Sequence, residues 1–194
     1  MTELIEDLDT ITKLESDSLT LTLAPCNIIE ICREALEGVE AKAVEMDIGL
    51  NLELPNENME SLHVLCGPNQ IMQVLTNLLV NSIHYGKKGG KTTLRLSLSG
   101  ENVLVQVADS GIGISQSDLT RIFERFYRVD KSRSRHAGGS GLGLSIVKHI
   151  IEAHGQNIHV DSTPNVGTTF SFQLVNLDAA AQKRNIRLDP LRRA

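Results

Sequence analysis

The sequence predicts an α+β fold: a two-layer α/β sandwich in which helices cover one face of a mixed, mostly antiparallel sheet. Apolar residues recur with a helical period in residues 27–46 and 71–83. They alternate with a period of two in residues 48–54. They alternate again in two segments between 91 and 109, which flank a turn at 99–102 and indicate a β-hairpin. The remaining predicted strands are residues 62–66, 158–161 and 168–174.

Composition narrows the class of protein. The 194 residues are 41% hydrophobic but only 3% aromatic, with no Trp, so the core is expected to consist of Leu, Ile and Val. A net charge of −5 argues against general nucleic-acid binding, which needs a basic surface. No run of about 18 apolar residues and no signal-peptide pattern occurs, so we expect that this fragment is not itself membrane-inserted. The three cysteines lack metal-site spacing and are expected to be reduced core thiols.

The chain divides into one domain with two appendages. Residues 1–24 are predicted to be an acidic helix end followed by a linker with a short extended piece that stops at Pro25. The globular domain is predicted to span 25–176. Residues 177–194 form a basic tail with the pattern of a frayed helix.

Serines and glycines mark the predicted loops and helix ends in the second half of the domain. The segment SQSDLTRIFERFYRVD predicts a short helix with Ser117 as its N-cap, and residues 131–140 predict a mobile loop. The segment GLGLSIVKHIIEAHG predicts a helix that opens on glycines and ends at Gly155.

Two asparagines lie four residues apart in the aliphatic helix NLLVNSIHYG. Asn77 and Asn81 therefore occupy one stripe of the helix. Buried amides without partners would each cost about 1–3 kcal/mol, so packing alone does not favour the pair. They are either a hydrogen-bonded polar pair of the core, a stripe facing solvent, or oxygen ligands for Mg²⁺, a hard cation that prefers oxygen.

A carboxylate precedes two glycines in ADSGIGI. Asp109 ends a predicted strand, and Gly111 and Gly113 would let a flat ligand lie against the backbone. Asp109 could then accept a hydrogen bond from an exocyclic amine, and a charged acceptor makes the stronger bond. A β-turn closed by the Asp side chain is the alternative.

Two glycine-rich stretches partly match the patterns of phosphate-binding loops. YGKKGGKTT has Tyr85 where the first P-loop glycine belongs, and it connects a helix to a strand, the reverse of a P-loop, so it predicts a turn. GGSGLGLS fails the dinucleotide pattern at Leu144. It nevertheless leaves backbone N–H groups at the positive end of a helix, where phosphates bind, although a flexible loop and cap would need the same glycines.

In their order and spacing, NLLVNSIHYG, DSGIGI, IFERFYRVD and GGSGLGLSIVKHI resemble the N, first glycine, F and second glycine boxes of the sensor histidine kinase catalytic domain. The resemblance covers roughly residues 27–175. It implies the Bergerat-type ATP-binding fold shared with gyrase, mismatch-repair ATPases and the large heat-shock chaperone.

The resemblance also implies roles for individual residues. Asn81 would be the principal Mg²⁺ ligand. Asn77 stands where gyrase-like ATPases carry a glutamate that activates water, and an amide cannot act as a general base. Tyr85 would pack on adenine, and His84 replaces the usual phosphate-binding lysine, which weakens that contact or makes it dependent on pH.

The same resemblance implies roles for the remaining residues of the site. Asp109 would read the adenine amine above Gly111 and Gly113, and Arg128 would face phosphate, with Lys131 and Arg133 as weaker candidates. The ATP lid would contain Gly139, Ser140, Gly141 and Gly143, with Leu142 and Leu144 as its anchors. Phe123 and Phe126 would pack against the lid. Gly167 and Thr168 would belong to the closing strand.

The implied mechanism is in-line transfer of the γ-phosphoryl group of ATP, with Mg²⁺, to a histidine. No histidine occurs in residues 1–62, so the phosphoacceptor is expected on a helical dimerisation domain outside this chain. Residues 1–24 would be the C-terminal end of that domain and the linker, since LIEDLDTITKLESDSLTL resembles the last turns of its second helix. A response regulator is the expected partner, and the domain is expected to be the cytoplasmic part of a membrane-anchored bacterial sensor kinase. An anti-sigma-factor-like serine kinase and a nucleotide-binding pseudokinase are the alternatives; Asn77 disfavours a gyrase-type ATPase.

Overall fold

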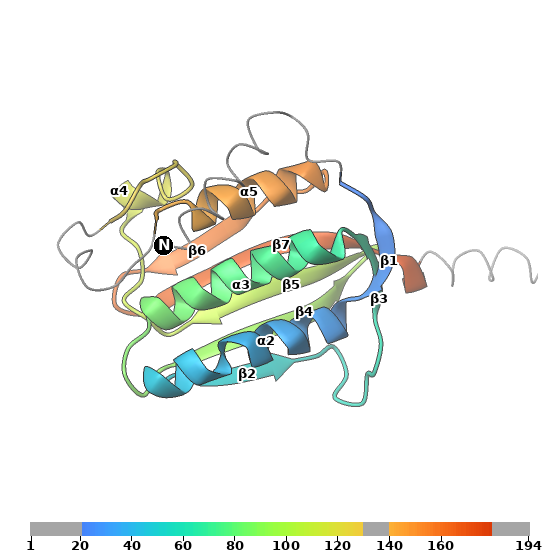
Figure 1. Cartoon of the computed structure of the whole chain (residues 1–194), viewed down its shortest axis with the longest axis horizontal. Coiled ribbons are helices and arrows are strands. Elements are labelled where there is room, and N and C mark those ends of the chain that lie inside the picture. Colours follow the sequence, from blue (N-terminus) through green and yellow to red (C-terminus); the bar gives the residue numbers. More distant parts are fainter. Residues whose placement is uncertain (1–20, 130–139, 180–194) are drawn as a thin grey trace, which may run out of the picture.

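The computed structural model describes residues 21–129 and 140–179, and all structural statements concern these residues (Figure 1). The strands are β1 (Ala24–Asn27), β2 (Gly49–Glu53), β3 (His63–Cys66), β4 (Lys91–Ser99), β5 (Asn102–Asp109), β6 (His159–Thr163) and β7 (Gly167–Asn176). The helices are α2 (Ile28–Glu45), α3 (Pro68–His84), α4 (Gln116–Leu119) and α5 (Gly143–Ala153).

The seven strands form one sheet in the order β1-β3-β7-β5-β4-β2, with β6 also paired to β7. Only β2 and β4 pair in parallel; the other pairs are antiparallel. The predicted hairpin is β4–β5, and its register aligns Asp109 with Thr92 on one side and with Thr168 of β7 on the other. The predicted mixed, mostly antiparallel sheet is confirmed.

Helices α2, α3 and α5 lie together on one face of the sheet, as predicted (Figure 1). Their apolar stripes and the strand residues beneath form one core, in which Ile, Leu and Val predominate and Phe172 is the largest fully buried side chain. Burial of this surface is the main stabilising contribution to the fold. None of the described helices is both long and apolar enough to cross a lipid bilayer.

Helix α3 begins without a side-chain cap. Its N-cap is Gly67 and it continues with Pro68, which needs no N–H partner at the first helical position. The Gly67 N–H donates to His154 Nε2 at 3.0 Å, and His154 Nδ1 donates to Ile150 O at 2.7 Å, so the imidazole is neutral. Burial lowers the pKa of His154, which favours that neutral state. The end of α5 thus holds the start of α3.

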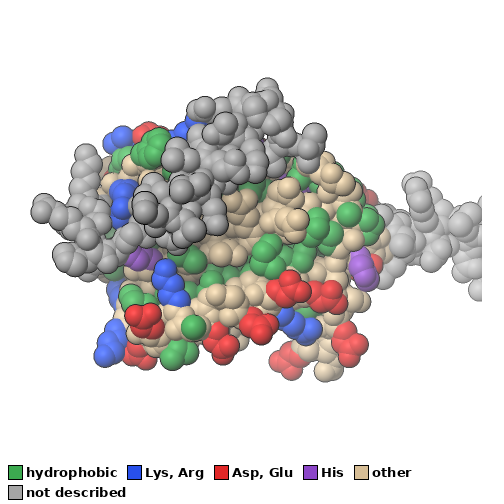
Figure 2. Space-filling model, viewed as in Figure 1, with side chains coloured by type: hydrophobic (Ala, Val, Ile, Leu, Met, Phe, Trp, Pro, Cys, Tyr) green, Lys and Arg blue, Asp and Glu red, His purple; other side chains and the backbone are tan. Residues whose placement is uncertain are grey.

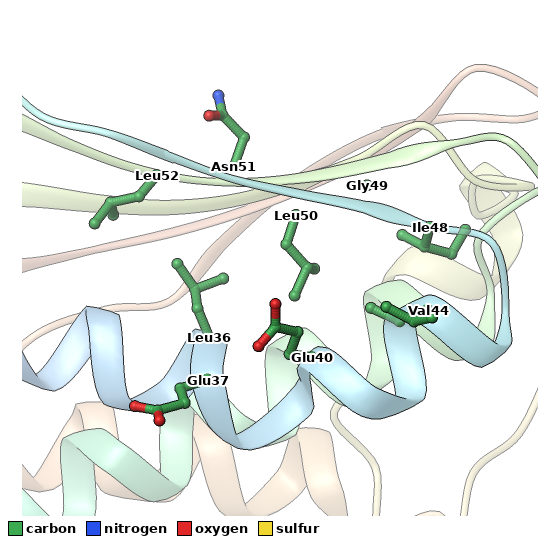
Figure 3. A pocket seen from close by; sticks show the side chains of 10 residues that line it. Leu36, Glu37, Glu40, Val44, Ile48, Gly49, Leu50, Asn51 and Leu52 are labelled. Carbon is green, nitrogen blue, oxygen red and sulfur yellow. The ribbon is translucent and has the colours of Figure 1, made fainter.

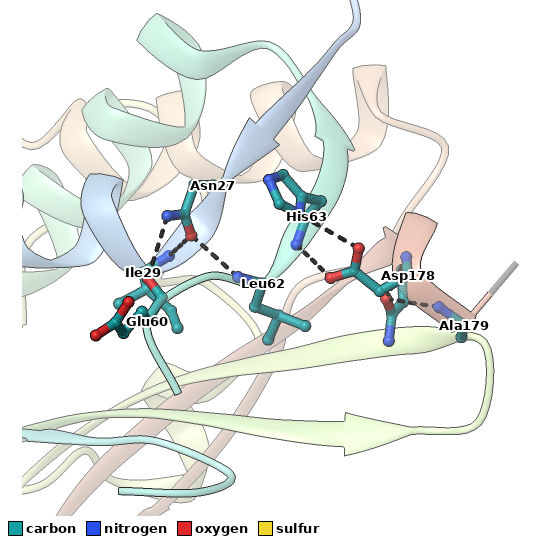
Figure 4. A network of polar contacts seen from close by, with 8 residues as sticks. Asn27, Ile29, Glu60, Leu62, His63, Asp178 and Ala179 are labelled. Atoms are coloured by element: carbon teal, nitrogen blue, oxygen red, sulfur yellow. Dashed lines mark hydrogen bonds and ion pairs between the residues drawn. The ribbon is translucent and has the colours of Figure 1, made fainter. Parts of the chain in front are cut away.

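A second polar network lies on the same side of the sheet, at the other end of β3 (Figure 4). The Asn27 side chain caps α2 at Ile29 N and also accepts the Leu62 N–H. Asp178 accepts the His63 N–H at 2.9 Å and contacts His63 Nδ1 at 3.2 Å. This network fixes the chain after β7 against β3.

Two local predictions are wrong. Pro25 does not stop the extended piece but lies inside β1, because β1 is an edge strand and proline is tolerated there. The helix after the first glycine motif has Ser115, not Ser117, as its N-cap and spans only four residues. Ser115 Oγ does not hydrogen-bond to the helix backbone but contacts Asp118 Oδ2 at 2.6 Å. Residues 120–126 continue as turns.

Candidate functional site

The asparagine stripe of α3 lies against the first residue of α5. A Cβ atom added to Gly143 would lie 3.3 Å from Asn77 Oδ1, so the Asn77 side chain lies close to the backbone of α5 here. Asn77 and Asn81 are both half-buried, which leaves their amides accessible from outside the core. The pair is therefore not a sealed polar pair of the core.

Helix α5 begins at an N-cap residue whose side chain cannot cap the first backbone donors. Its N-cap is Leu142, which forms no side-chain cap hydrogen bond. The first N–H groups of a helix lack intrahelical partners and lie at its positive end. This end faces Asn77, and such an arrangement favours an anionic oxygen close to the amide.

The Asp109 carboxylate is held at the end of β5. Its Oδ1 accepts the Gly111 N–H at 2.7 Å. Burial raises the pKa of the Asp109 carboxyl, and hydrogen bonds from the backbone of Gly111 and Thr168 partly offset that rise. The carboxylate is thus a half-buried acceptor at the level of the last turn of α3.

Tyr85 and Gly111 meet through their backbones. The Ile112 N–H donates to Tyr85 O at 3.1 Å, and a Cβ on Gly111 would lie only 2.4 Å from that oxygen and 2.6 Å from Asp109 Oδ1. No larger residue fits at Gly111 without moving the backbone. His84 and Tyr85 stack edge to face, with ring centroids 4.8 Å apart. The structure therefore brings together His84, Tyr85, Asp109 and Gly111.

Gly113 lies where the loop after β5 crosses the turn between β6 and β7. Its φ is +67°, and an added Cβ would lie 2.1 Å from Thr163 O. The Ile114 N–H donates to Ser162 Oγ, and this hydroxyl contacts Thr168 Oγ1 at 2.9 Å. Thr168 is buried, so its hydroxyl holds the loop rather than lining an open surface.

The predicted lid is anchored at its C-terminal end. The Phe126 N–H donates to Gly141 O at 3.0 Å, Ser140 Oγ accepts the Leu142 N–H at 3.3 Å, and Leu142 is buried. Leu144 is half-buried against the core. Gly139, Lys131 and Arg133 lie outside the described residues.

Arg128 belongs to the segment between α4 and the lid. Arg121 and residues 124–129 line an open hollow of about 590 Å³. Tyr127 Oη donates to Asp118 Oδ1 at 2.6 Å, and the Arg121 guanidinium lies 4.2 Å from the centre of the Tyr127 ring. Phe123 packs against Phe170, whereas Phe126 is 65% exposed. A phosphate contact for the half-buried Arg128 stays a prediction.

Sequence reasoning missed the hydroxyl groups that support the site. Thr92 Oγ1 donates to Ser82 Oγ at 2.9 Å, and Ser82 Oγ donates to Leu79 O, both buried between α3 and β4. Ser162 holds the Gly113 loop in the same way. Serines and threonines in helices and strands carry no distinctive spacing, so only the pairing of distant segments reveals these contacts.

A protein family, related sequences and solved structures all match this chain as the same type of domain. Residues 66–178 match the family described as "Histidine kinase-, DNA gyrase B-, and HSP90-like ATPase". The sensor histidine kinase WalK of Bacillus subtilis is 35% identical over 176 residues, which are 90% of this chain and 28% of WalK. This chain thus spans little more than a quarter of that relative.

Solved structures give the same result. The catalytic domain of histidine kinase ThkA has a TM-score of 0.68 and 31% identity, covering 79% of this chain and 95% of that one. ThkA in complex with response regulator TrrA has a TM-score of 0.69 and 28% identity, covering 90% and 48%. Full-length ShkA in complex with AMPPNP has a TM-score of 0.78 and 26% identity, covering 90% and 36%.

In this chain the asparagine stripe of α3, the Asp109–Gly111 turn and the glycine-rich start of α5 lie within a fold like that of these catalytic domains. The chain belongs to the histidine kinase-, DNA gyrase B- and HSP90-like ATPase family, as a catalytic ATP-binding domain of the histidine kinase type.

Proposed function

We propose that this chain binds Mg²⁺·ATP between α3, the Asp109–Gly113 loop and the start of α5. In this proposal it presents the γ-phosphoryl group to a histidine on a helical dimerisation domain outside the chain. The observation that carries the proposal is the approach of Asn77 to Gly143: a Cβ added to Gly143 would lie 3.3 Å from Asn77 Oδ1, so this amide oxygen lies near the positive end of α5.

The donor set fits both groups. Amide oxygens of Asn81 and Asn77 are hard ligands of the kind that Mg²⁺ accepts alongside phosphate and water. Gly111 lets the backbone pass close to Tyr85 O and Asp109 Oδ1 where a Cβ would clash, and the half-buried Asp109 carboxylate would accept a hydrogen bond from the adenine amine. Tyr85 would pack on the base, and His84 and Arg128 would contact phosphate. Bound Mg²⁺ would neutralise charge that develops on the transferred phosphoryl group.

The chain's own residues favour transfer over hydrolysis. Asn77 can hold a water molecule or a metal but cannot remove a proton from it, because an amide has no basic site near neutral pH. The phosphoryl group would therefore await a histidine nucleophile. Catalysis would rest on positioning by Gly141, Leu142 and Gly143 at the lid base and on the backbone donors of α5.

The same proposal names the partners. The phosphoryl group would pass to a response regulator, and ThkA, a structural neighbour, is known in complex with one. The domain would act in the cytoplasm, where ATP is available, as part of a two-component system.

The Asp109→Asn variant tests adenine reading. Asparagine keeps an oxygen for the Gly111 N–H but loses the charge, so the preference for ATP over GTP should fall about tenfold, the difference between a charged and a neutral hydrogen bond. Competition binding measures this preference. Asp161→Asn on β6, an exposed carboxylate, is the matched control and should change nothing. An unchanged preference in Asp109→Asn would remove Asp109 from the site.

A further inference from the structure

The loop after β5, residues 110–114, lies between two segments that are far from it in the sequence. The α3 segment, residues 85–90, joins α3 to β4. The β6–β7 turn, residues 164–166, joins those two strands. Because Asp109 stands directly before the loop, the contacts that hold the loop also hold the carboxylate that is proposed to read adenine.

The chain between α3 and β4 holds one side of the loop. The Ile112 N–H donates to Tyr85 O at 3.1 Å. Lys91 is the first residue of β4, and its N–H donates to Ser110 Oγ at 2.9 Å, while its carbonyl accepts the Ser110 N–H at 3.1 Å. The loop is therefore hydrogen-bonded at both ends of the α3 segment.

The β6–β7 turn holds the other side of the loop. The Asn165 N–H donates to Ile112 O at 2.7 Å. Asn165 has a φ of +64°, a conformation that asparagine adopts more readily than most L-residues. A Cβ added to Gly167, directly after the turn, would lie 2.0 Å from Asp109 O, so the chain here packs against Asp109 itself. Ile112 thus accepts from one segment and donates to the other.

The Lys87 side chain joins these two segments directly. Its Nζ donates to Asn165 O, and a charged donor makes a stronger hydrogen bond than a neutral one. The contacts form a closed ring, from Tyr85 to Ile112, from Ile112 to Asn165 and from Asn165 to Lys87, which is two residues from Tyr85. The loop after β5 is enclosed by this ring.

Lys87 extends from a backbone that is itself held in place. The Gly90 N–H donates to Lys87 O at 2.7 Å, and Gly90 O accepts the Gly49 N–H at 2.9 Å. Figure 3 shows Ile48 and Gly49 where the chain passes from α2 into β2. A Cβ added to Gly86 would lie 2.7 Å from Ile48 Cδ1, so the α3 segment packs closely against this connection. The ammonium group is therefore attached to the sheet through a supported turn.

We propose that Lys87 is a positioning residue for the nucleotide, because its hydrogen bond to Asn165 O holds the loop after β5, and with it Asp109, in the geometry that reads adenine. This inference rests on the proposed function. A loop that is already held in the binding geometry loses less conformational freedom when a ligand binds, which preserves affinity. Lys87 would act through the loop and not through a contact of its own with ATP.

The neighbouring lysine provides a matched control. Lys87 and Lys88 are both exposed, and Lys88 forms no side-chain hydrogen bond or ion pair within the described ranges. Figure 2 shows Lys and Arg side chains at the surface near the end of α3, so the region is basic in either variant. Lys87→Met and Lys88→Met remove the same charge, whereas only Lys87→Met removes the donor to Asn165 O. Lys87→Arg keeps a charged donor.

Amide hydrogen exchange of the nucleotide-free chain tests whether Lys87 holds the loop. In Lys87→Met the Ile112 and Asn165 N–H groups should exchange about fivefold faster, the scale of one hydrogen bond, because the ring opens more often. Exchange at both groups should be unchanged in Lys88→Met and restored in Lys87→Arg. Equal exchange in Lys87→Met and Lys88→Met would overturn the proposal.

Titration calorimetry with Mg²⁺·ATP tests the link to the nucleotide. Lys87→Met should bind about fivefold more weakly than Lys88→Met, and Lys87→Arg should recover most of the affinity. Faster exchange with unchanged ATP affinity would contradict the positioning role. Weaker binding without faster exchange would mean that Lys87 contacts the nucleotide itself, which would also contradict it. Failure of the unaltered chain to bind Mg²⁺·ATP would instead contradict the proposed function, and the exchange result would still report on the ring.

Discussion

Replacing Asn81 with alanine is expected to abolish the Mg²⁺-dependent part of ATP binding. Asn81 lies one turn beyond Asn77 on the half-buried stripe that borders the start of α5. Its loss would remove an oxygen ligand, and changes around a metal commonly lower affinity by roughly 10–100-fold even when a ligand is only disturbed. Titration calorimetry with and without Mg²⁺ separates this contribution from the metal-independent contacts of the base.

The control for this experiment lies on the same stripe. Gln73 is one turn before Asn77 and is also half-buried, so Gln73→Ala removes an amide from the same face of α3 outside the proposed site. It should leave Mg²⁺·ATP affinity unchanged. If Asn81→Ala bound Mg²⁺·ATP as tightly as Gln73→Ala, Asn81 would not be the metal ligand.

Replacing Gly113 with alanine is expected to destabilise the domain by about 2–4 kcal/mol, near the upper end of single substitutions. The φ of +67° costs an L-residue about 1–2 kcal/mol. The added methyl group would also lie 2.1 Å from Thr163 O, where only backbone movement can relieve the overlap. Equilibrium unfolding in urea measures the change in the free energy of unfolding.

The Gly89→Ala variant separates the cost of the positive φ from the cost of the overlap with Thr163 O. Its φ is +73°, but an added Cβ has no atom within 4 Å, so Gly89→Ala should cost only the conformational part. Gly113→Ala must lose clearly more stability than Gly89→Ala. Equal losses would mean that the loop after β5 does not press against the end of β6.

Periodicity predicted the fold well because the apolar residues follow the two faces that the core needs. The stripes of α2 and α3 and the alternation in β4 and β5 are buried as expected. Pro25 was misread because its cost depends on strand position, and the sequence does not show that β1 lies at an edge. Ser117 was misread because Ser115 and Ser117 are both plausible caps, and only the chain path decides between them.

The site was predicted from motifs, and the structure brings part of it together. Asn77 meets Gly143, and Tyr85 meets Asp109 through Gly111, although these segments are far apart in the sequence. Thr168 is buried and its hydroxyl contacts Ser162, a contact that no motif indicated. The domain limits of 25–176 and the roles assigned to individual residues stay predictions.

The distinction between kinase and hydrolase activity rests on whether residue 77 carries an amide or a basic carboxylate. Within this family the fold alone does not separate the two, because its matching description includes both kinases and other ATPases. In the proposed site Asn77 would place an amide oxygen where a hydrolase needs a base to activate water. ATP should therefore persist in the site until a histidine arrives.

The most direct measurement is Mg²⁺·ATP titration calorimetry on the whole chain, with phosphate release followed in the same sample. We expect saturable, Mg²⁺-dependent binding with almost no phosphate release. Binding with steady phosphate release would contradict the assignment of Asn77 and indicate a gyrase-type ATPase. Absence of binding would contradict the central claim that this end of the sheet is a nucleotide site.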